Sequence, residues 1–315
     1  MDFSEAREVR SIDIIIVNWN SGPQLQACIE SIRAHGDGLV GRCIVVDNGS
    51  SDGSTDFLAG AADVDLVLTG QNLGFGRACN LGAARGDSPY LLFLNPDAWL
   101  MPGSLRLPLD FMSRPENGQV GISGIALIDE TGKVQRSCAR FPNAAGMFMS
   151  SFGLNRLIPS MGTHMHDWDH AQTREVPHVI GAFYLIRRPL FERLRGFDER
   201  FFVYLEDVDL SRRARLAGYR SYFLTEAQAF HEGGGVSSQV KAHRLFYSLR
   251  SRIQYARKHF SGPGALAVVA ATLTVEPITR LGLLILKRRF RELGDLRRGF
   301  GMLWAWALRD RKGAA

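Results

Sequence analysis

The stretch 90-YLLFLNPDA-98 decides the fold of this chain, because five apolar residues run directly into Asn95, Pro96 and Asp97. A short, continuous apolar run that ends in a turn is typical of a strand buried on both faces of a sheet. A carboxylate that follows such a strand lies at the carboxyl edge of an open α/β sheet, where ligands bind in these folds. The stretch therefore predicts a parallel sheet with Asp97 at its binding edge.

The same arrangement occurs twice earlier in the chain. Residues 12–17 form a run rich in β-branched residues before Asn18, Trp19 and Asn20, and residues 43–46 form an apolar run before Asp47. A further strand is expected at 64–68, and helices are expected at 25–34 and 77–84. Strands separated by single helices form right-handed crossovers. The chain therefore predicts an α/β fold with a Rossmann-like, mostly parallel central sheet flanked by helices.

Beyond Asp97 the alternation of strands and helices is less regular. Residues 142–173, rich in Met, Phe, Gly, Ser and His, predict a long irregular segment of the kind that serves as a functional loop or lid. The other expected elements are strands at 120–128 and 179–186, a hairpin or edge at 132–140, and helices at 189–194 and 205–217.

Composition fits a globular chain in a reducing compartment. The 315 residues are 45% hydrophobic and 22% charged, enough to bury a large core. The four cysteines are widely spaced, so they predict buried free thiols and neither a zinc knuckle nor a disulfide framework. The first ten residues are charged and lack the apolar core of a secretory signal. We therefore expect a cytoplasmic location.

The C-terminal region differs in charge from the rest. Residues 241–315 contain 16 basic and 4 acidic residues, whereas residues 1–240 contain 22 and 28. The apolar stretch 264–286 is interrupted by Glu276, Pro277 and Arg280, so it does not predict a clean membrane span. Its basic and aromatic continuation suits a helix on an anionic membrane surface. A helical pair packed on the catalytic domain or on a homodimer partner fits equally well.

Two of the polar clusters suit a nucleotide. The segment Asn18, Trp19 and Asn20 could flank a planar base, or form a turn around a buried tryptophan. Asp47, followed by Asn48 and Ser50 in a run of small residues, could accept hydrogen bonds from a ribose. Such Asx-Gly-Ser runs also serve simply as turns and helix caps.

Two further clusters suit a diphosphate and a cation. Asn72 and Gly74 lie in a glycine-containing loop just before the helix that includes Arg77, and helix N-termini bind phosphates. The P-loop Lys-Ser/Thr and the Rossmann spacing are both missing, which disfavours an ATPase or a dehydrogenase. Beside a diphosphate, Asn95 and Asp97 would hold Mg²⁺ or Mn²⁺; the alternative is a proline turn with a capping aspartate.

The last cluster joins Glu206 and Asp207, at the start of a helix, to the distant His231. Acidic residues in a first helical turn are also ordinary partners of the helix dipole. Three other histidines lie close together in the 142–173 segment, but no second ligand pair has the spacing of structural zinc. We expect them to be solvated loop residues: His164, His166 and His170.

In chain order, these clusters resemble family 2 of the inverting glycosyltransferases, which have the GT-A fold, and within it the rhamnosyltransferase-like branch. The resemblance covers roughly residues 10–260. Its motifs are VNWN at 17–20, VVDNGSSDG at 45–53, NLGFG at 72–76, LNPD at 94–97, GAF at 181–183, GFDE at 196–199, residues 201–210 with Glu206 and Asp207, and His231.

The resemblance implies a role for each cluster. Asp207 would be the general base, with Glu206 beside it, and Asp97 and His231 would hold the metal, Mg²⁺ or Mn²⁺. The nucleotide sugar would bind to Asn18, Trp19, Asn20, Asp47, Asn48, Ser50, Asn72, Gly74, Arg77, Asn95 and Asp97. The chain departs from the family at Asn95, where the DXD-like motif usually has its first aspartate. The metal therefore has one carboxylate fewer available.

The implied enzyme is a metal-dependent inverting glycosyltransferase of cell-surface polysaccharide synthesis. Rhamnose from dTDP-rhamnose would pass to a saccharide or a polyprenyl-diphosphate-linked acceptor, and no nucleic acid is expected as a partner. We expect a catalytic domain at 1–240, with a nucleotide-sugar half at about 10–100 and an acceptor half at about 101–240. A basic helical appendage at 241–315 would place the protein peripherally on the inner face of the cytoplasmic membrane.

Three alternatives stay open. The donor could be another UDP-, GDP- or dTDP-sugar. A nucleotidyltransferase of related fold is a second alternative, although the chain lacks an obvious glycine-rich basic motif for a triphosphate. The third is a non-catalytic nucleotide-sugar-binding protein.

Overall fold

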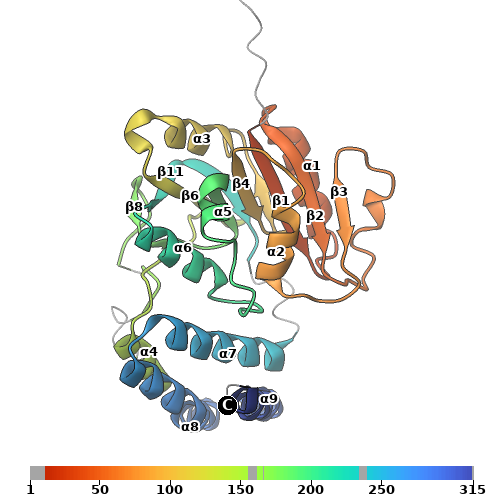
Figure 1. The fold of residues 1–315 in the computed structure, drawn as a ribbon. Helices are drawn as coiled ribbons and strands as arrows, with labels where there is room; N and C mark the ends of the chain where they lie inside the picture. The colour runs from red at the N-terminus through yellow and green to blue at the C-terminus, as the bar shows by residue number, and fades with distance from the viewer. Residues whose placement is uncertain (1–10, 155–161, 166, 234–239, 314–315) are drawn as a thin grey trace, which may run out of the picture.

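The computed structural model describes residues 11–154, 162–165, 167–233 and 240–313. One large mixed sheet lies between two groups of helices, and three long C-terminal helices form a layer at one end of the molecule (Figure 1). The strands are β1 (Ile12–Asn18), β2 (Val40–Asp47), β3 (Asp65–Leu68), β4 (Tyr90–Leu94), β5 (Ala98–Leu100), β6 (Val120–Ile128), β7 (Cys138–Ala139), β8 (Arg174–Val176), β9 (His178–Val179), β10 (Phe183–Arg187) and β11 (Arg220–His231).

The helices follow the strands in the predicted alternation over the first hundred residues. They are α1 (Gln24–His35), α2 (Phe75–Ala83), α3 (Arg106–Ser113), α4 (Ala144–Ser151), α5 (Arg188–Arg193), α6 (Glu206–Leu216), α7 (Lys241–His259), α8 (Gly262–Leu286) and α9 (Leu293–Gly313). Short 3₁₀ turns occupy Asp56–Leu58, Pro115–Asn117 and Phe290–Glu292.

The large sheet has the strand order β3-β2-β1-β4-β10-β6-β11-β5, and β8 pairs with β11. The first four strands are parallel, as the strand-helix alternation predicts. β10 is antiparallel to both of its neighbours, β4 and β6, whereas β6 and β11 are parallel to each other. The predicted α/β fold with a Rossmann-like central sheet is confirmed.

The sheet is buried on both faces because alternate strand residues point to opposite sides. On one face, Ile12, Ile14 and Ile16 of β1 pack in a cluster that includes residues of α1 and α3. On the other face, Ile15 and Val17 pack in a cluster that includes residues of α2, α5 and α6. This two-sided burial explains why the strands consist of continuous apolar runs.

The four cysteines are free and buried, as the sequence predicts. Burial raises the pKa of the Cys43 thiol to about 12, and it also raises the pKa of Cys28, Cys79 and Cys138. Thiols that stay protonated are poor nucleophiles. The cysteines are therefore core residues.

The prediction of an irregular segment at 142–173 is wrong in part, because α4 lies within it. The side chain of Asn143 caps this helix by accepting a hydrogen bond from the Gly146 amide at 2.8 Å. Met147 then packs against apolar residues of α6, α7 and α8. Tertiary burial and a cap therefore order a stretch with little helical pattern. Residues 155–161 and 166 lie outside the described residues.

The prediction that the neighbouring histidines are solvated is also wrong for His170. Its ring is fully buried, stacks on Trp168 at 4.2 Å between centroids, and accepts a hydrogen bond from the Cys138 amide at Nε2, at 3.2 Å. Burial lowers the pKa of His170, so the ring stays neutral. His164 is exposed, as predicted, and His166 is not among the described residues.

Two boundaries also differ from the predicted ones. The strand expected at 179–186 is interrupted at 180–182, leaving β9 and β10 as separate strands in two different sheets. The helix expected at 77–84 begins two residues earlier, at Phe75, directly after Gly74. Both differences lie beside the cavity described below.

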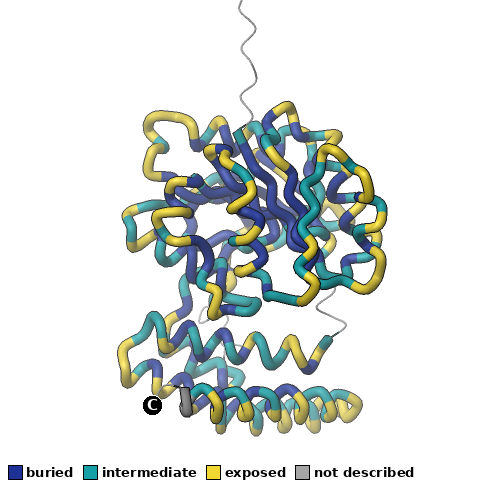
Figure 2. Tube along the Cα trace, turned by 45° about the vertical axis from the view of Figure 1, so that its right-hand side comes forward, coloured by how far each residue is buried: buried dark blue, intermediate teal, exposed yellow. Residues whose placement is uncertain are grey.

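The C-terminal layer is attached to the part of the protein that contains the sheet through α7. Asp209 of α6 is fully buried, and it pairs with Lys258 at 2.7 Å and with His259 at 2.6 Å, both near the end of α7. Tyr255 of α7 also packs in an apolar cluster with Phe201 and Val208. α8 and α9 pack on the other side of α7 (Figure 2).

Among the described residues, one helix is long and apolar enough to cross a membrane on length and composition alone, namely α8. Glu276 lies buried within it and pairs with Arg252 of α7 and with Arg280 one turn later. α8 contacts α4, α7 and α9. In this structure it is part of a helical layer on the body of the protein.

A buried ion pair joins the edge of the sheet opposite the cavity to α5. Asp13 of β1 is fully buried and lies 2.8 Å from a guanidinium nitrogen of Arg188. The same guanidinium donates to the carbonyl oxygens of Ser88, at 2.6 Å, and Ala83, at 2.9 Å. Arg188 therefore satisfies three buried acceptors that belong to β1, α2 and the turn before β4.

We predict that Arg188→Ala lowers the free energy of unfolding by about 3–5 kcal/mol, because it leaves the Asp13 carboxylate buried without its counter-charge. Urea unfolding measures this difference. The exposed Arg193 on the same helix is the matched control, and Arg193→Ala should change stability by less than about 0.5 kcal/mol. Equal losses in the two variants would contradict the assignment.

Candidate active site

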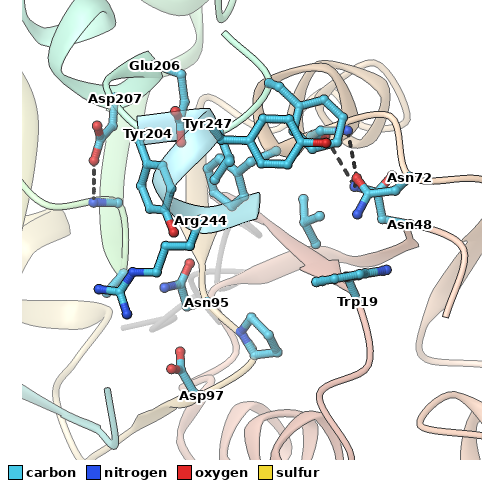
Figure 3. A pocket seen from close by; sticks show the side chains of 18 of the residues that line it. Trp19, Asn48, Asn72, Asn95, Asp97, Tyr204, Glu206, Asp207, Arg244 and Tyr247 are labelled. Atoms are coloured by element: carbon cyan, nitrogen blue, oxygen red, sulfur yellow. Dashed lines mark hydrogen bonds between the residues drawn. The ribbon is translucent and has the colours of Figure 1, made fainter. Parts of the chain in front are cut away.

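A cavity of about 780 Å³ lies at the carboxyl edge of β1, β2 and β4. Figure 3 shows it from close by. The loop at 202–204, the start of α6 and one face of α7 form its other sides. The sequence-predicted residues that line it are Trp19, Asn48, Asn72, Gly74, Asn95, Asp97, Glu206, Asp207 and His231.

Five other predicted residues do not line this cavity, and four of them form the layer behind it. The Asn18 amide donates to Asp47 at 2.8 Å and to Ser54 at 2.9 Å. The backbone amide of Ser50 donates to Asp47 at 3.1 Å. The Ser50 hydroxyl accepts a hydrogen bond from the backbone amide of Asn20 at 2.9 Å. These bonds join the ends of β1 and β2. The fifth residue, Arg77, is exposed and lies 3.7 Å from Glu199.

Asn48 fixes the loop that precedes α2. Its side-chain oxygen accepts from the Leu73 amide at 2.8 Å, and its nitrogen donates to Asn72 at 3.1 Å. Gly74 has a φ of +86°, and a Cβ there would lie 2.4 Å from the carbonyl oxygen of Phe202. Only glycine therefore permits this close approach of the α2 loop to the loop that leads into α6.

Asp97 and His231 meet because β5, which begins just after Asp97, pairs antiparallel with the end of β11. Oδ1 of Asp97 lies 3.5 Å from Nε2 of His231. Both side chains are largely buried, and Oδ1 accepts no hydrogen bond from the described residues. A buried carboxylate oxygen without a donor is costly, so this arrangement favours a further positive group there.

Gln135 determines which nitrogen of His231 faces Asp97. The Gln135 amide nitrogen donates to the backbone oxygen of His231 at 2.6 Å, so its side-chain oxygen faces Nδ1 at 2.8 Å. A carbonyl oxygen only accepts, and Nδ1 therefore has the proton. In the neutral ring Nε2 then presents a lone pair toward Asp97.

These two groups fit a divalent cation. A carboxylate oxygen and an imidazole nitrogen are both metal ligands, and the second nitrogen of a ligating histidine usually donates to an oxygen, as Nδ1 does here. The described residues contain no cluster of three or more His, Cys, Asp or Glu that could hold a metal. The remaining ligands would have to come from water and a bound diphosphate.

Glu206 and Asp207 follow a strained turn. Tyr204 and Leu205 both have left-handed backbone angles, with φ of +71° and +66°. Consecutive non-glycine residues in this region are uncommon, and such strain is concentrated at functional sites. The turn places both carboxyl groups at the cavity.

The two carboxyl groups differ in protonation. Burial, with the negative charge of Asp207 as a second cause, raises the pKa of Glu206 well above its usual range. Burial also opposes ionisation of Asp207, but His178 and the amides of Val208 and Gly181 outweigh it and lower the pKa. The surroundings therefore favour the ionised form of Asp207 and the neutral form of Glu206.

A buried hydrogen-bonded series supports Asp207 from behind. Nε2 of His178 lies 3.4 Å from Asp207, and its Nδ1 lies 2.9 Å from the Ser211 hydroxyl. That hydroxyl lies 2.9 Å from the hydroxyl of Tyr184. The Gly181 amide donates to Asp207 at 2.9 Å, a bond drawn in Figure 3. These partners fix the orientation of the carboxylate.

Asp207 and Asp97 lie on opposite sides of the cavity, and Asn95 lies between them in the view of Figure 3. Trp19, Asn48 and Asn72 lie together on a third side. An ionised carboxylate therefore faces a candidate cation site across a space lined by an aromatic ring and amides. Such a site suits the transfer of a group from a diphosphate to a hydroxyl.

The comparisons with known proteins agree with a site that transfers a group from a diphosphate to a hydroxyl. The family model described as Glycosyl transferase family 2 matches residues 13–195. This chain belongs to glycosyltransferase family 2. The N-acetylglucosaminyl-diphospho-decaprenol L-rhamnosyltransferase of Mycobacterium tuberculosis (strain CDC 1551 / Oshkosh) is 30% identical over 251 residues, which are 74% of this chain and 81% of that protein. The rhamnosyltransferase WbbL of Escherichia coli (strain K12) is 27% identical over 78% of this chain and 92% of its own length.

Solved structures share the fold of this glycosyltransferase. The mannosyltransferase PcManGT from Pyrobaculum calidifontis, in complex with GDP-Man and Mn²⁺, superposes with a TM-score of 0.52 at 16% identity, covering 96% of this chain and 88% of that one. GalNAc-T7 with UDP, GalNAc and Mn²⁺ gives a TM-score of 0.53 at 14% identity, over 79% and 50% of the two chains. These similarities confirm the predicted GT-A-like fold.

Part of this glycosyltransferase's cavity was not anticipated from its sequence. Val240, His243, Arg244 and Tyr247 lie at i, i+3, i+4 and i+7 and present one face of α7 to the cavity. Tyr247 stacks on Phe202 at 4.3 Å between ring centroids. The helical spacing of these residues was the one sequence pattern that could have indicated this face. A helix face without a motif, however, does not reveal which part of the protein it covers.

We predict that Glu206→Gln makes the folded glycosyltransferase more stable at about pH 8 than the wild type, by about 1 kcal/mol or more. The raised pKa of Glu206 stabilises the fold below the ordinary glutamate pKa, and this contribution is lost as the pH rises toward the folded-state value. Glutamine keeps the shape of the neutral acid and does not titrate.

Urea unfolding at about pH 4 and about pH 8 measures the effect, and the two proteins should agree at the lower pH. The exposed Glu130 supplies the control, since Glu130→Gln should leave stability unchanged at both pH values. A difference between wild type and Glu206→Gln that is independent of pH would show that Glu206 is already ionised.

Proposed function

We propose that this glycosyltransferase moves rhamnose from dTDP-rhamnose to a hydroxyl of a polyprenyl-diphosphate-linked saccharide, with inversion of the anomeric centre. The observation that supports it best is the opposition of Asp207 to the pair Asp97 and His231 across one cavity. The mycobacterial and Escherichia coli relatives are both named as rhamnosyltransferases, and the name of the first includes a diphospho-decaprenol acceptor.

The donor would occupy the side of the cavity formed by β1, β2 and the α2 loop. Trp19 offers an apolar face to the base, and Asn48 and Asn72 offer amides. Asn18, Asn20, Asp47 and Ser50, which lie behind the cavity, would act by holding these residues in place. Gly74 would let the diphosphate approach the N-terminus of α2.

Asp97 and His231 would hold Mg²⁺ or Mn²⁺, with Asn95 nearby. A divalent cation bound there offsets the negative charge that develops on the diphosphate leaving group. His231 is held for this task by Gln135. With asparagine at position 95, Asp97 is the only carboxylate of the DXD-like motif that can take part.

Asp207 would accept the proton of the acceptor hydroxyl as that hydroxyl attacks the anomeric carbon. Because Asp207 lies across from the diphosphate site, attack occurs on the face opposite the leaving group, and a single displacement inverts the centre. His178 holds Asp207 ionised before the proton moves. A neutral Glu206 adds no second negative charge beside the base.

We predict that Asp207→Asn lowers sugar transfer by about 10²–10⁴-fold while donor binding persists, because only the proton acceptor is lost. Asp97→Ala should lower both transfer and metal-supported donor binding. Turnover across a panel of dTDP-, UDP- and GDP-sugars with Mg²⁺ or Mn²⁺ measures the first effect, and calorimetry measures the second.

Asp129→Asn, in a turn outside the cavity, is the control and should behave as the wild type. Turnover of a different nucleotide sugar would show that rhamnose is not the sugar transferred, and it would leave the proposed mechanism unchanged. Binding of a nucleotide sugar without turnover of any would support a non-catalytic binding protein. Undiminished transfer by Asp207→Asn would exclude Asp207 as the base.

The outer side of the C-terminal layer suggests how a lipid-linked acceptor is reached. Ile278, Leu281 and Ile285 are exposed on one face of α8, and Trp304 and Leu308 are exposed on α9. Exposed basic residues accompany them: Arg288, Arg291, Arg297 and Arg298. We propose that this layer, the lowest in Figure 1, lies on the anionic cytoplasmic face of a membrane.

Flotation with anionic vesicles should recover the wild-type protein, and neutral vesicles should recover much less. The double variant Ile278→Glu and Ile285→Glu should lose about tenfold or more of this binding. Leu216→Glu, at an exposed leucine of α6, is the matched control. If the double variant floats as well as the control, the layer does not bind lipid. A change from dimer to monomer in the double variant would show instead that the layer is a homodimer interface.

A further inference from the structure

We propose that a second cavity, enclosed by α7, α8 and α9, binds the diphosphate of the polyprenyl-diphosphate-linked acceptor; this rests on the function proposed above. The cavity has a volume of about 470 Å³. Its lining comes from the start of α7, the end of α8 and the segment that joins α8 to α9. It is a separate cavity from the one that contains Asp97 and Asp207.

The charge of this second cavity fits a diphosphate. Five basic side chains line it, against two acidic ones, Glu292 and Asp295. The basic residues are Lys241, Arg244, Arg280, Lys287 and Arg289. A cavity with such an excess of one charge attracts an anion of more than one charge, and lysine and arginine are the side chains that bind phosphate groups.

Three of these cations are available to a ligand. Arg280 pairs with Glu276 at 2.8 Å, and Arg289 pairs with Glu292. Within the described part of the chain, no ion pair is formed by Lys241, Arg244 or Lys287. Two of these charges come from α7 and one from the residue that follows α8.

The same cavity also has an apolar part, which favours a lipid diphosphate over inorganic phosphate. Leu245 of α7, Leu283 and Leu284 of α8 and Leu296 of α9 line it. A purely anionic ligand would gain nothing from these leucines, whereas the first isoprenoid units of a polyprenyl chain would bury apolar surface against them. The exposed residues Ile278, Leu281 and Ile285 belong to another face of the same helix.

Arg244 connects this cavity to the active site, because it lines both. Figure 3 shows its side chain extending from α7 into the active-site cavity. A diphosphate bound by Lys241, Arg244 and Lys287 would therefore leave the sugar attached to it beside Arg244, on the side of the active site that α7 forms. α7 would align the acceptor, and its position depends on the ion pairs of Asp209.

Calorimetric titration with farnesyl diphosphate tests this site on the full-length protein. Lys287→Glu and Lys241→Glu should each weaken binding by about tenfold or more, because each replaces an attractive charge by a repulsive one. Arg193→Glu makes the same change at an exposed basic residue of α5 that does not line the cavity, and it should weaken binding by less than about twofold. Inorganic pyrophosphate should compete weakly, and farnesol should not bind measurably.

Equal effects of Lys287→Glu and Arg193→Glu, or no effect of either lysine variant, would overturn the proposal. Pyrophosphate binding as tight as that of farnesyl diphosphate would also overturn it, by assigning the cavity to a free phosphate. Titration of the same proteins with dTDP, UDP and GDP, each with Mg²⁺ or Mn²⁺, separates this proposal from the first. If none of the three nucleotides binds, the glycosyl-transfer proposal fails, whatever the farnesyl diphosphate results are.

Discussion

The site depends on the parallel register of β1 with β2 and β4. Asn18 lies opposite Asp47, and Ile16 lies opposite Leu94, so the three strands end at one edge of the sheet. Each strand continues into polar residues that cannot extend it, and these residues meet in the cavity. A shift of one residue in either pairing would turn the polar ends to the other face of the sheet. The apolar contacts on both faces prevent such a shift.

Strands with antiparallel partners, β10 and β11, position the other side of the cavity. β10 follows the break at 180–182, where Gly181 donates to Asp207. β11 brings His231 beside β5 and hence beside Asp97. The residues on the two sides of the cavity thus come from different parts of the chain, and the pairing of the strands brings them together.

The electrostatics of the site depend on the neighbours of each acid rather than on the acids themselves. Glu206 and Asp207 are adjacent in the chain, the first buried and the second partly buried, but only Asp207 has His178 and two backbone amides around its carboxylate. Two titratable groups whose environments move their pKa values apart are typical of acid-base sites. The third acid of the same helix, Asp209, pairs with Lys258 and His259 of α7 and with Arg213 one turn later in α6.

The sequence by itself determined the sheet edge and part of the cavity lining, because a buried parallel strand must be apolar throughout and its first polar residue marks its end. Trp19, Asn48, Asn95 and Asp97 all follow from that rule. Tertiary structure alone decided the rest. Gln135, His178 and the α7 face lie in segments without a motif, and Asn18 and Asp47 turn out to hold the lining rather than form it. These roles depend on which side chains meet after distant segments pair, and local pattern contains no information about such contacts.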